Sequence, residues 1–286
     1  MRHLIFRAAR AHPTAMALLV AALLVSSCSS NNEAPSKPSA TDFGHIHGIG
    51  LNPADNSVYV ASHNGVFAIV DGKGVLIANR RQDTMGFTIA GPNDFLASGH
   101  PDPASETPNP LGLIRSTDGA RTWQTQSLGG KDDLHSIDSA GGLVYAYGAA
   151  GEVMMSRDRT SWKPVLRAAL IDFAVDPQRS TRLVATTGDG RVITWDVGEK
   201  PRPVTSAPPL VFIDRTSRSE LVGVDPSGQV FTSDPDGKTW STRQQLPGQP
   251  ESISVRANTW LAATSTGIYQ SVDEGRSWSL LLSRRP

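Results

Sequence analysis

Five histidines carry the strongest chemical signal in this sequence of 286 residues. They are His45, His47, His63, His100 and His135. Imidazole nitrogen is a borderline ligand that suits Zn or Cu, and a nearby thioether such as that of Met85 would shift the preference toward Cu(I). His45 and His47 lie two apart, so they project from the same side if they lie on a strand. The set predicts a metal site, or a site for another ligand that uses imidazole.

The elements that position these histidines repeat along the chain. A glycine recurs just before a short apolar run, at Gly65, Gly112, Gly151, Gly190, Gly228 and Gly267. The separations are 47, 39, 39, 38 and 39 residues, and the first is longer because it contains the proline-rich segment 100–110. Units of about 40 residues match the blades of a β-propeller.

Each repeat contains four β-like runs bounded by turn residues, and in the first repeat these are HIHGIGL, SVYVAS, VFAIV and VLIAN. Stretches with helical periodicity do not separate the runs, which disfavours an α/β fold. Seven blades would need about 280 residues at this period. Residues 43–286 provide 244. We therefore expect an all-β, six-bladed β-propeller over 43–286, with no substantial helix.

The topology of an antiparallel blade predicts that the five histidines share one face. The start of the first strand and the turn after the second strand lie at the same end of a blade. The histidines fall at these two places in three adjacent repeats. Aligning HGIGL, MGFTI and HSIDS places His47, Met85 and His135 at corresponding positions, and the last repeat offers Glu251 there.

These positions divide into expected ligands and accessory residues. The expected metal ligands are His45, His47, His63 and His135. The additional residues of the ligand face are Met85, His100 and Glu251. His100 begins the proline-rich loop, so we expect it to act as a lid residue rather than as an obligatory ligand.

A second repeated signature follows the third run of four repeats. Residues 271–278 fit S-x-D-x-G-x-[ST]-W, the Asp-box or BNR pattern, and 116–123, 156–162 and 233–240 fit it partly. A short Asp or Ser side chain caps the amides of a tight turn there, and Trp covers the sheet edge. The residues given this structural role are Ser116, Asp118, Trp123, Ser156, Asp158, Trp162, Ser233, Asp236, Trp240, Ser271, Asp273, Gly275 and Trp278.

The whole pattern resembles a family of bacterial lipoproteins labelled glycosyl-hydrolase-like. The resemblance rests on GHIHGIGLNPADNSVYVASHNGVF at 44–67, MGF at 85–87, ASGHPDP at 97–103 and NPLGLIRSTDG at 109–119, together with the boxes. Asp-box propellers include sialidases and other glycosidases, sortilin-type receptors and photosystem-assembly factors. The resemblance implies a fold more firmly than a function. The box residues lie at the end opposite the usual ligand site, so they are expected to be structural.

The chemistry of a sialidase requires residues that this chain does not present in recognisable form. The resemblance to sialidases would imply an F/Y-R-I-P motif, which is absent after Cys28, and a Tyr–Glu nucleophile pair. All four tyrosines fall in second or third runs, where packing within a blade is the expected role. Asp133, Asp172 and Glu251 fall near starts of first runs and could face a channel, although solvated or turn-capping acids are the simpler interpretation.

The N-terminus has the pattern of a lipoprotein leader. Residues 1–27 contain Arg2, Arg7 and Arg10 and an apolar run of 11 residues, too short for the roughly 20 that span a bilayer. The run ends Val25-Ser26-Ser27-Cys28, which resembles a bacterial lipobox. We expect a signal peptide over 1–27, an acylated Cys28, and a flexible tether over 28–42 that lacks large aliphatic side chains.

Composition excludes other classes. The 27 basic and 27 acidic side chains argue against a polybasic nucleic-acid surface. A single cysteine excludes an internal disulfide framework and a cysteine-based zinc cluster. The chain is expected at the extracytoplasmic face of the cell envelope, with lipid membrane as a partner through Cys28.

Three functions from different classes are consistent with these residues. The first is a propeller that binds a transition metal, Zn or Cu, or a small ligand at the histidine face. The second is a glycoside hydrolase or sialidase-like enzyme that acts on a glycan. The third is a platform for an envelope protein, in which the histidines only satisfy turn hydrogen bonds.

Overall fold

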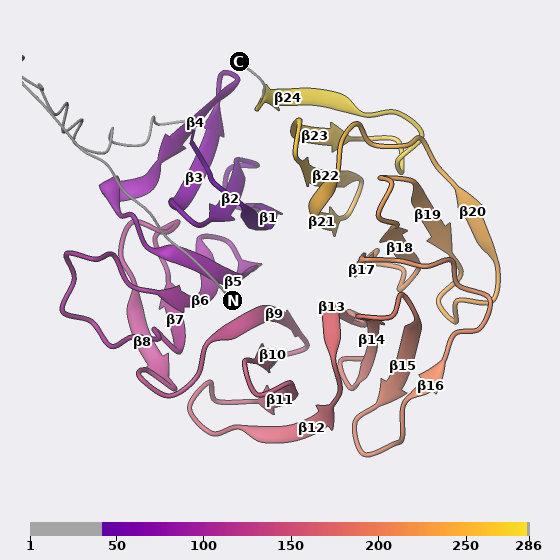
Figure 1. Cartoon of the computed structure of the whole chain (residues 1–286), viewed down its shortest axis with the longest axis horizontal. Helices are drawn as coiled ribbons and strands as arrows, with labels where there is room; N and C mark the ends of the chain where they lie inside the picture. The colour runs from indigo at the N-terminus through magenta and orange to yellow at the C-terminus, as the bar shows by residue number, and fades with distance from the viewer. Residues whose placement is uncertain (1–41, 285–286) are drawn as a thin grey trace, which may run out of the picture. The chain divides into compact units, whose positions relative to one another are not determined.

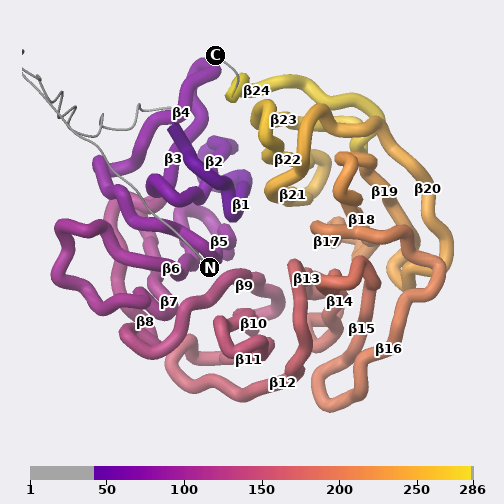
Figure 2. Tube along the Cα trace, in the orientation of Figure 1, coloured from indigo at the N-terminus to yellow at the C-terminus, as the bar shows by residue number. Residues whose placement is uncertain are grey.

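The computed structural model describes residues 42–284, so Cys28, the expected signal peptide and most of the tether lie outside the described residues. Twenty-four strands form six four-stranded antiparallel sheets, and the first strand of each sheet faces a common centre (Figure 1). The tube in Figure 2 shows the same ring, passing once through each blade in sequence order. The expected all-β, six-bladed propeller is confirmed.

The four strands of every blade follow one another in sequence from the centre outward. Blade 1 contains β1 (Ile46–Leu51), β2 (Val58–Ser62), β3 (Gly65–Val70) and β4 (Lys73–Leu76). Blade 2 contains β5 (Asp83–Gly91), β6 (Asp94–His100), β7 (Leu113–Ser116) and β8 (Gln124–Ser127). Blade 3 contains β9 (Leu134–Ala140), β10 (Leu143–Gly148), β11 (Glu152–Ser156) and β12 (Lys163–Arg167).

The second half of the ring repeats this plan. Blade 4 contains β13 (Leu170–Val175), β14 (Arg182–Thr187), β15 (Val192–Asp196) and β16 (Arg202–Pro203). Blade 5 contains β17 (Phe212–Arg215), β18 (Leu221–Val224), β19 (Val230–Ser233) and β20 (Trp240–Thr242). Blade 6 contains β21 (Pro250–Arg256), β22 (Thr259–Thr264), β23 (Gly267–Ser271) and β24 (Ser279–Ser283).

The apolar core lies between blades. Second strands such as β2, VYVAS, are buried along their whole length because a neighbouring blade covers each face of the sheet. Six apolar clusters result, one at each junction of adjacent blades. At the junction of the last and first blades, Phe43 and Phe67 pack with Leu261 and Leu282. The ring is thus closed by side chains, without exchange of a strand between its ends.

One expected strand differs from the structure. The run VLIAN forms strand only to Leu76, and Ile77–Asn79 form the short 3-10 helix η1, in which Ala78 has φ 52°. The chain must turn here to reach the centre and begin blade 2, which an extended run would not allow. Within residues 42–284, no helix has the length and apolar character needed to cross a membrane.

Candidate functional site

Three imidazoles lie against one another at one end of blade 1. His47 lies on β1, His45 directly precedes it, and His63 lies in the turn after β2. The His63 backbone N–H donates to the His45 carbonyl at 3.1 Å, which fixes this turn beside the start of β1. The ring centroids of His47 are 4.8 Å from His45 and 4.6 Å from His63. Antiparallel pairing therefore brings together residues up to 18 positions apart in sequence.

Asp83, the first residue of β5, completes a set of three ligand atoms. One donor atom each from His47, His63 and Asp83 lies within 4.8 Å of the others. The His47 Nε2 and Asp83 Oδ1 atoms are 3.8 Å apart. Both are buried, and neither has a hydrogen-bond partner among the described residues. Buried polar atoms normally have a partner. A cation bound between His47 Nε2 and Asp83 Oδ1 would supply the partner that both atoms lack.

The charge state of His47 suits this role. Burial lowers the pKa of His47 from 6.5 to about 4, with further lowering by His45, His63 and His135, while Asp133 opposes it. The imidazole is consequently neutral near pH 7, the form that binds a metal. Burial also raises the pKa of Asp83, against the opposing effect of His63 and His100.

A second group of the same residue types lies on blades 2 and 3. Asp133 Oδ2 is 3.1 Å from His135 Nε2 and 3.4 Å from His100 Nε2. The hydrogen bond with Asp133 raises the pKa of His135. We call the two groups together the histidine rim, which consists of His45, His47, His63, Asp83, His100, Asp133 and His135.

Two glycines shape the rim. Gly44, with φ 62°, precedes His45, and a Cβ there would lie 3.2 Å from that of His63. Gly99, with φ 136°, precedes His100, and a Cβ there would meet the Asp83 carbonyl oxygen at 2.0 Å. Gly99 thus allows the irregular register of β5 and β6, in which Asp83 lies opposite His100.

The structure brings all five histidines, including the accessory residue His100, to one end of blades 1–3. Met85 lies on β5 and lines the central cavity. Glu251 binds Arg284 at 2.6 Å and accepts the Ile46 N–H at 2.9 Å, so its carboxylate connects two blades. The geometry therefore favours a structural role for Glu251 over a role as a metal ligand.

Sequence analysis missed Asp83 as a ligand and assigned Asp133 only as a possible channel acid. The signal was present in the alignment of HGIGL, MGFTI and HSIDS, because the residues two positions earlier are His45, Asp83 and Asp133. Every one of the first three repeats thus places a metal-ligating side chain type at the start of its innermost strand.

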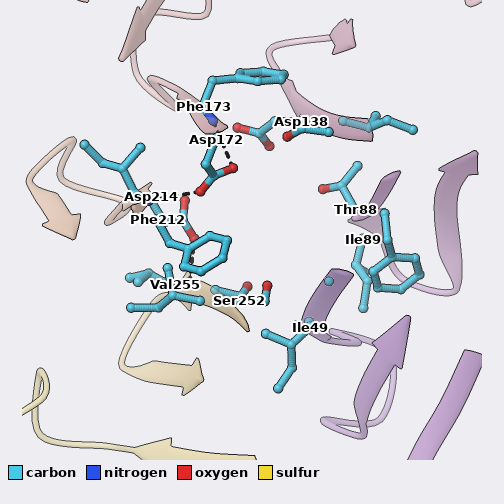
Figure 3. Close-up of a pocket in the computed structure, with 18 of the residues that line it drawn as sticks. Ile49, Thr88, Ile89, Asp138, Asp172, Phe173, Phe212, Asp214, Ser252 and Val255 are labelled. Carbon is cyan, nitrogen blue, oxygen red and sulfur yellow. Dashed lines mark hydrogen bonds between the residues drawn. The ribbon is translucent and has the colours of Figure 1, made fainter. Parts of the chain in front are cut away.

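The rim lies at the mouth of a central cavity of about 670 Å³. His45, His47 and His135 line its end, and apolar side chains such as Ile49, Ile89 and Phe212 line its wall (Figure 3). No tyrosine is among the lining residues within 42–284. A sialidase-type Tyr–Glu pair is accordingly absent from the lining of this cavity.

Three half-buried aspartates occupy the same position on the innermost strands of blades 3, 4 and 5 (Figure 3). Asp138, Asp172 and Asp214 each accept a backbone N–H of the next blade, at 2.7, 3.0 and 2.6 Å. Burial raises the pKa of Asp138 to about 6 and that of Asp172 to about 7, and it raises the pKa of Asp214 well above its ordinary value. Asp172 therefore lines the cavity and accepts a backbone N–H of the next blade, in place of capping a turn.

The four box segments form turns between third and fourth strands, at the end opposite the rim. Ser116 and Ser271 accept the N–H of the residue four positions on, at 2.8 and 2.9 Å, and Asp118 and Asp273 accept an N–H at 2.9 Å. In the shorter turn, Asp158 accepts the Ser161 N–H at 2.7 Å. The tryptophans pack on four junction clusters: Trp123, Trp162, Trp240 and Trp278.

The turn over 233–240 differs from the expectation. Asp234 accepts the Thr239 N–H at 2.8 Å and its hydroxyl at 2.7 Å. Asp236 instead pairs with Arg182 and Lys238 at 2.9 Å. Pro235 at the usual acid position cannot accept these bonds, so the preceding residue takes the role.

These features define a class, a six-bladed β-propeller with a rim of histidine and aspartate at one mouth of its channel. Comparison with known protein families finds no match, and comparison with curated proteins finds no relative. The fold is similar to that of YCF48 bound to a D1 peptide, with 17% identity, coverage of 83% of this chain and 81% of that chain, and a TM-score of 0.50.

A chain of the nidogen/laminin complex is 12% identical, with coverage of 79% and 88% and a TM-score of 0.54. YCF48 from Cyanidioschyzon merolae is 14% identical, with coverage of 82% and 84% and a TM-score of 0.47. Identities this low show the β-propeller fold alone.

Proposed function

We propose that this chain is a transition-metal-binding β-propeller of the cell envelope, anchored by a lipid on Cys28. The observation that carries the metal proposal is the pair of buried, unpartnered donor atoms, His47 Nε2 and Asp83 Oδ1, with His63 beside them. Two imidazoles and a carboxylate suit Zn²⁺ or Cu²⁺ better than Cu(I), because a carboxylate is a hard ligand. Three protein ligands leave a coordination position for water or for a bound molecule.

The Asp-box and lipoprotein resemblance supports the envelope assignment and the structural role of the turns. The lipobox-like sequence precedes the tether, which would hold the propeller outside the cytoplasmic membrane. The expected partners are the lipid membrane and, at the open coordination position, a small ligand, a glycan or an envelope protein.

The test of metal binding is a titration of mature, metal-free protein with Zn²⁺ and with Cu²⁺. We expect His63→Ala to weaken the affinity by at least about 100-fold, since loss of even an outer-shell partner costs 10–100-fold. The matched control is Glu106→Gln, an exposed residue of the loop that follows His100. No binding by the wild type, or equal affinity in the His63 variant, would refute the proposal.

Glycoside hydrolysis is a second candidate, favoured by one observation. Asp138 and Asp172 line the cavity with pKa values of about 6 and 7, the range that suits a general acid. The metal proposal ranks first because both Asp172 oxygens already accept backbone N–H groups. Hydrolysis of aryl glycosides by the wild type and its loss in Asp172→Asn would support an enzyme, and the absence of turnover would refute it.

A further inference from the structure

In the second group of the histidine rim, both separations from the central carboxylate have the length found between ligands of one metal. Two ligands that are each 2.0–2.1 Å from a tetrahedral metal lie about 3.3 Å from one another. Asp133 Oδ2 is 3.1 Å from His135 Nε2 and 3.4 Å from His100 Nε2. These two separations have the length of an edge of such a tetrahedron.

Hydrogen bonds around this group orient its donor atoms. His100 Nδ1 lies 2.8 Å from Asn109 Oδ1, so it carries a proton and donates to that oxygen. With the proton on Nδ1, Nε2 is the ring nitrogen available to a metal, 3.4 Å from Asp133 Oδ2. An oxygen or amide that holds the other ring nitrogen is the usual outer partner of a metal-bound histidine.

Asp133 has a further donor atom without a partner. Its Oδ1 is buried and accepts no hydrogen bond from the described residues, and its side chain is only 13% exposed. His100 and His135 are 46% and 45% exposed, so solutes reach them from outside. A cation can therefore reach the group from solvent through the two imidazoles, and the mostly buried Asp133 carboxylate supplies the negative charge that would bind it.

The two groups are adjacent without sharing a residue. Asp83 and His100 are paired residues of β5 and β6, and each belongs to a different group. The charge of Asp133 acts on both His47 and Asp83. Carboxylates of like charge repel one another, and a divalent cation bound at each group would offset that repulsion.

We propose that the histidine rim binds two divalent transition-metal ions, one at His47, His63 and Asp83 and the other at His100, Asp133 and His135. This inference rests on the proposed function, because it adds a second position to the same rim. His100, the last residue of β6, is then a ligand held by the β5–β6 pairing rather than a lid residue alone.

The test is the number of Cu²⁺ ions that mature protein binds, with the two positions removed in turn. We expect two equivalents for the wild type, one for His63→Ala and one for Asp133→Asn or His135→Ala. The two single-position variants should lose the dipolar broadening that two neighbouring Cu²⁺ ions give in the electron paramagnetic resonance spectrum. Glu106→Gln, on the loop that follows His100, should keep two equivalents.

The outcomes separate the two proposals. Zero equivalents in the wild type would refute the proposed function itself. One equivalent, lost in His63→Ala and kept in Asp133→Asn, would overturn the second position and leave the first standing. Two equivalents that Asp133→Asn and His135→Ala both retain would also overturn it. Because His135 is exposed, His135→Ala keeps the fold, and an unchanged melting temperature checks this.

Discussion

Glu251 and Arg284 form an ion pair of 2.6 Å where the last blade meets the first. Arg284 also donates to the carbonyls of Thr264 and Gly44, at 2.8 and 2.6 Å, and Glu251 accepts the Ile46 N–H. The two side chains are only 14% and 12% exposed. The pair therefore connects β21, the end of β24 and the segment entering β1, at the junction that closes the ring.

Removing the cation from this junction should destabilise the whole ring. Arg284→Met leaves the Glu251 carboxylate largely buried without its charge partner, and we expect a loss of about 2–3 kcal/mol of unfolding free energy. That corresponds to a melting temperature lower by about 5–10 °C. The control is Arg167→Met, whose pair with Glu152 is exposed and should contribute less than about 1 kcal/mol. Equal losses in thermal unfolding would contradict this role.

Stability should depend on pH through the half-buried aspartates. The folded-state pKa values of Asp138 and Asp172, about 6 and 7, lie above the ordinary value of 3.8. Their contribution is therefore complete below about pH 4 and is lost as the pH rises through 6 to 7. Asp172→Asn removes one such group, so the variant should lose less stability than the wild type when the pH is raised from 5 to 8. Thermal unfolding of both proteins at the two pH values measures this, and an unchanged difference would disprove it.

His47 should titrate apart from ordinary histidines. Its folded-state pKa of about 4 lies below 6.5, so we expect its imidazole to stay neutral at pH 5.5 in metal-free protein. His135, whose pKa is raised, should be protonated there. Histidine ring resonances followed by NMR across pH 3.5–8, assigned with His47→Gln, test the pair. A midpoint for His47 near 6.5 would show that it is not buried as described.

The box turn over 233–240 allows a comparison of two neighbouring acids. Asp234→Ala removes the acceptor of four hydrogen bonds within the turn and should lower the melting temperature by about 2–4 °C, as the loss of a capping side chain does. Asp236→Ala breaks only exposed ion pairs and should have a smaller effect. A larger loss of melting temperature for Asp236→Ala than for Asp234→Ala in differential scanning fluorimetry would show that Asp236 is the residue that stabilises the turn.

The membrane anchor is tested independently of the propeller. Cys28→Ser removes the thiol that would carry the diacylglycerol, and the protein should move from the membrane fraction to the soluble envelope fraction or the medium. Ser36→Ala, in the tether, should leave the distribution unchanged. Membrane retention of the Cys28 variant, together with processing that globomycin does not inhibit, would show that the anchor assignment is wrong.

The repeat pattern was sufficient to predict the ring because each blade is encoded locally. Glycines such as Gly65 and Gly267 mark the turn before a third strand, and their spacing counts the blades. The common face of the histidines followed from strand direction alone. The proximity of Asp83 to His47 could not be predicted in this way, because Asp83 lies at the start of β5, in the next blade.

Residue type alone could not show whether a carboxylate binds a ligand or forms an ion pair within the fold. Glu251 occupies a rim position by alignment, yet the nearest cation is Arg284, 33 residues later in sequence. Glu251 pairs with Arg284 because the first and last blades meet when the ring closes, and a sequence pattern within one repeat does not contain that information. The aspartates at 138, 172 and 214 each follow an isoleucine, a repeat that the sequence displays and that indicates their shared place on the innermost strand.

Because each sheet consists of four consecutive strands, the place where the chain begins is not fixed by the fold. The ends of β24 and β1 approach one another through Arg284 and Gly44. A circular permutant that starts at β5 and ends after η1, with a short linker across the old termini, should therefore assemble the same ring. In such a molecule the first and second blades would meet without a covalent link, so the His47–Asp83 contact would become a junction between chain ends. A cation bound by His47, His63 and Asp83 would then hold the two ends of the permuted chain together, so the stability of the ring would depend on the cation concentration.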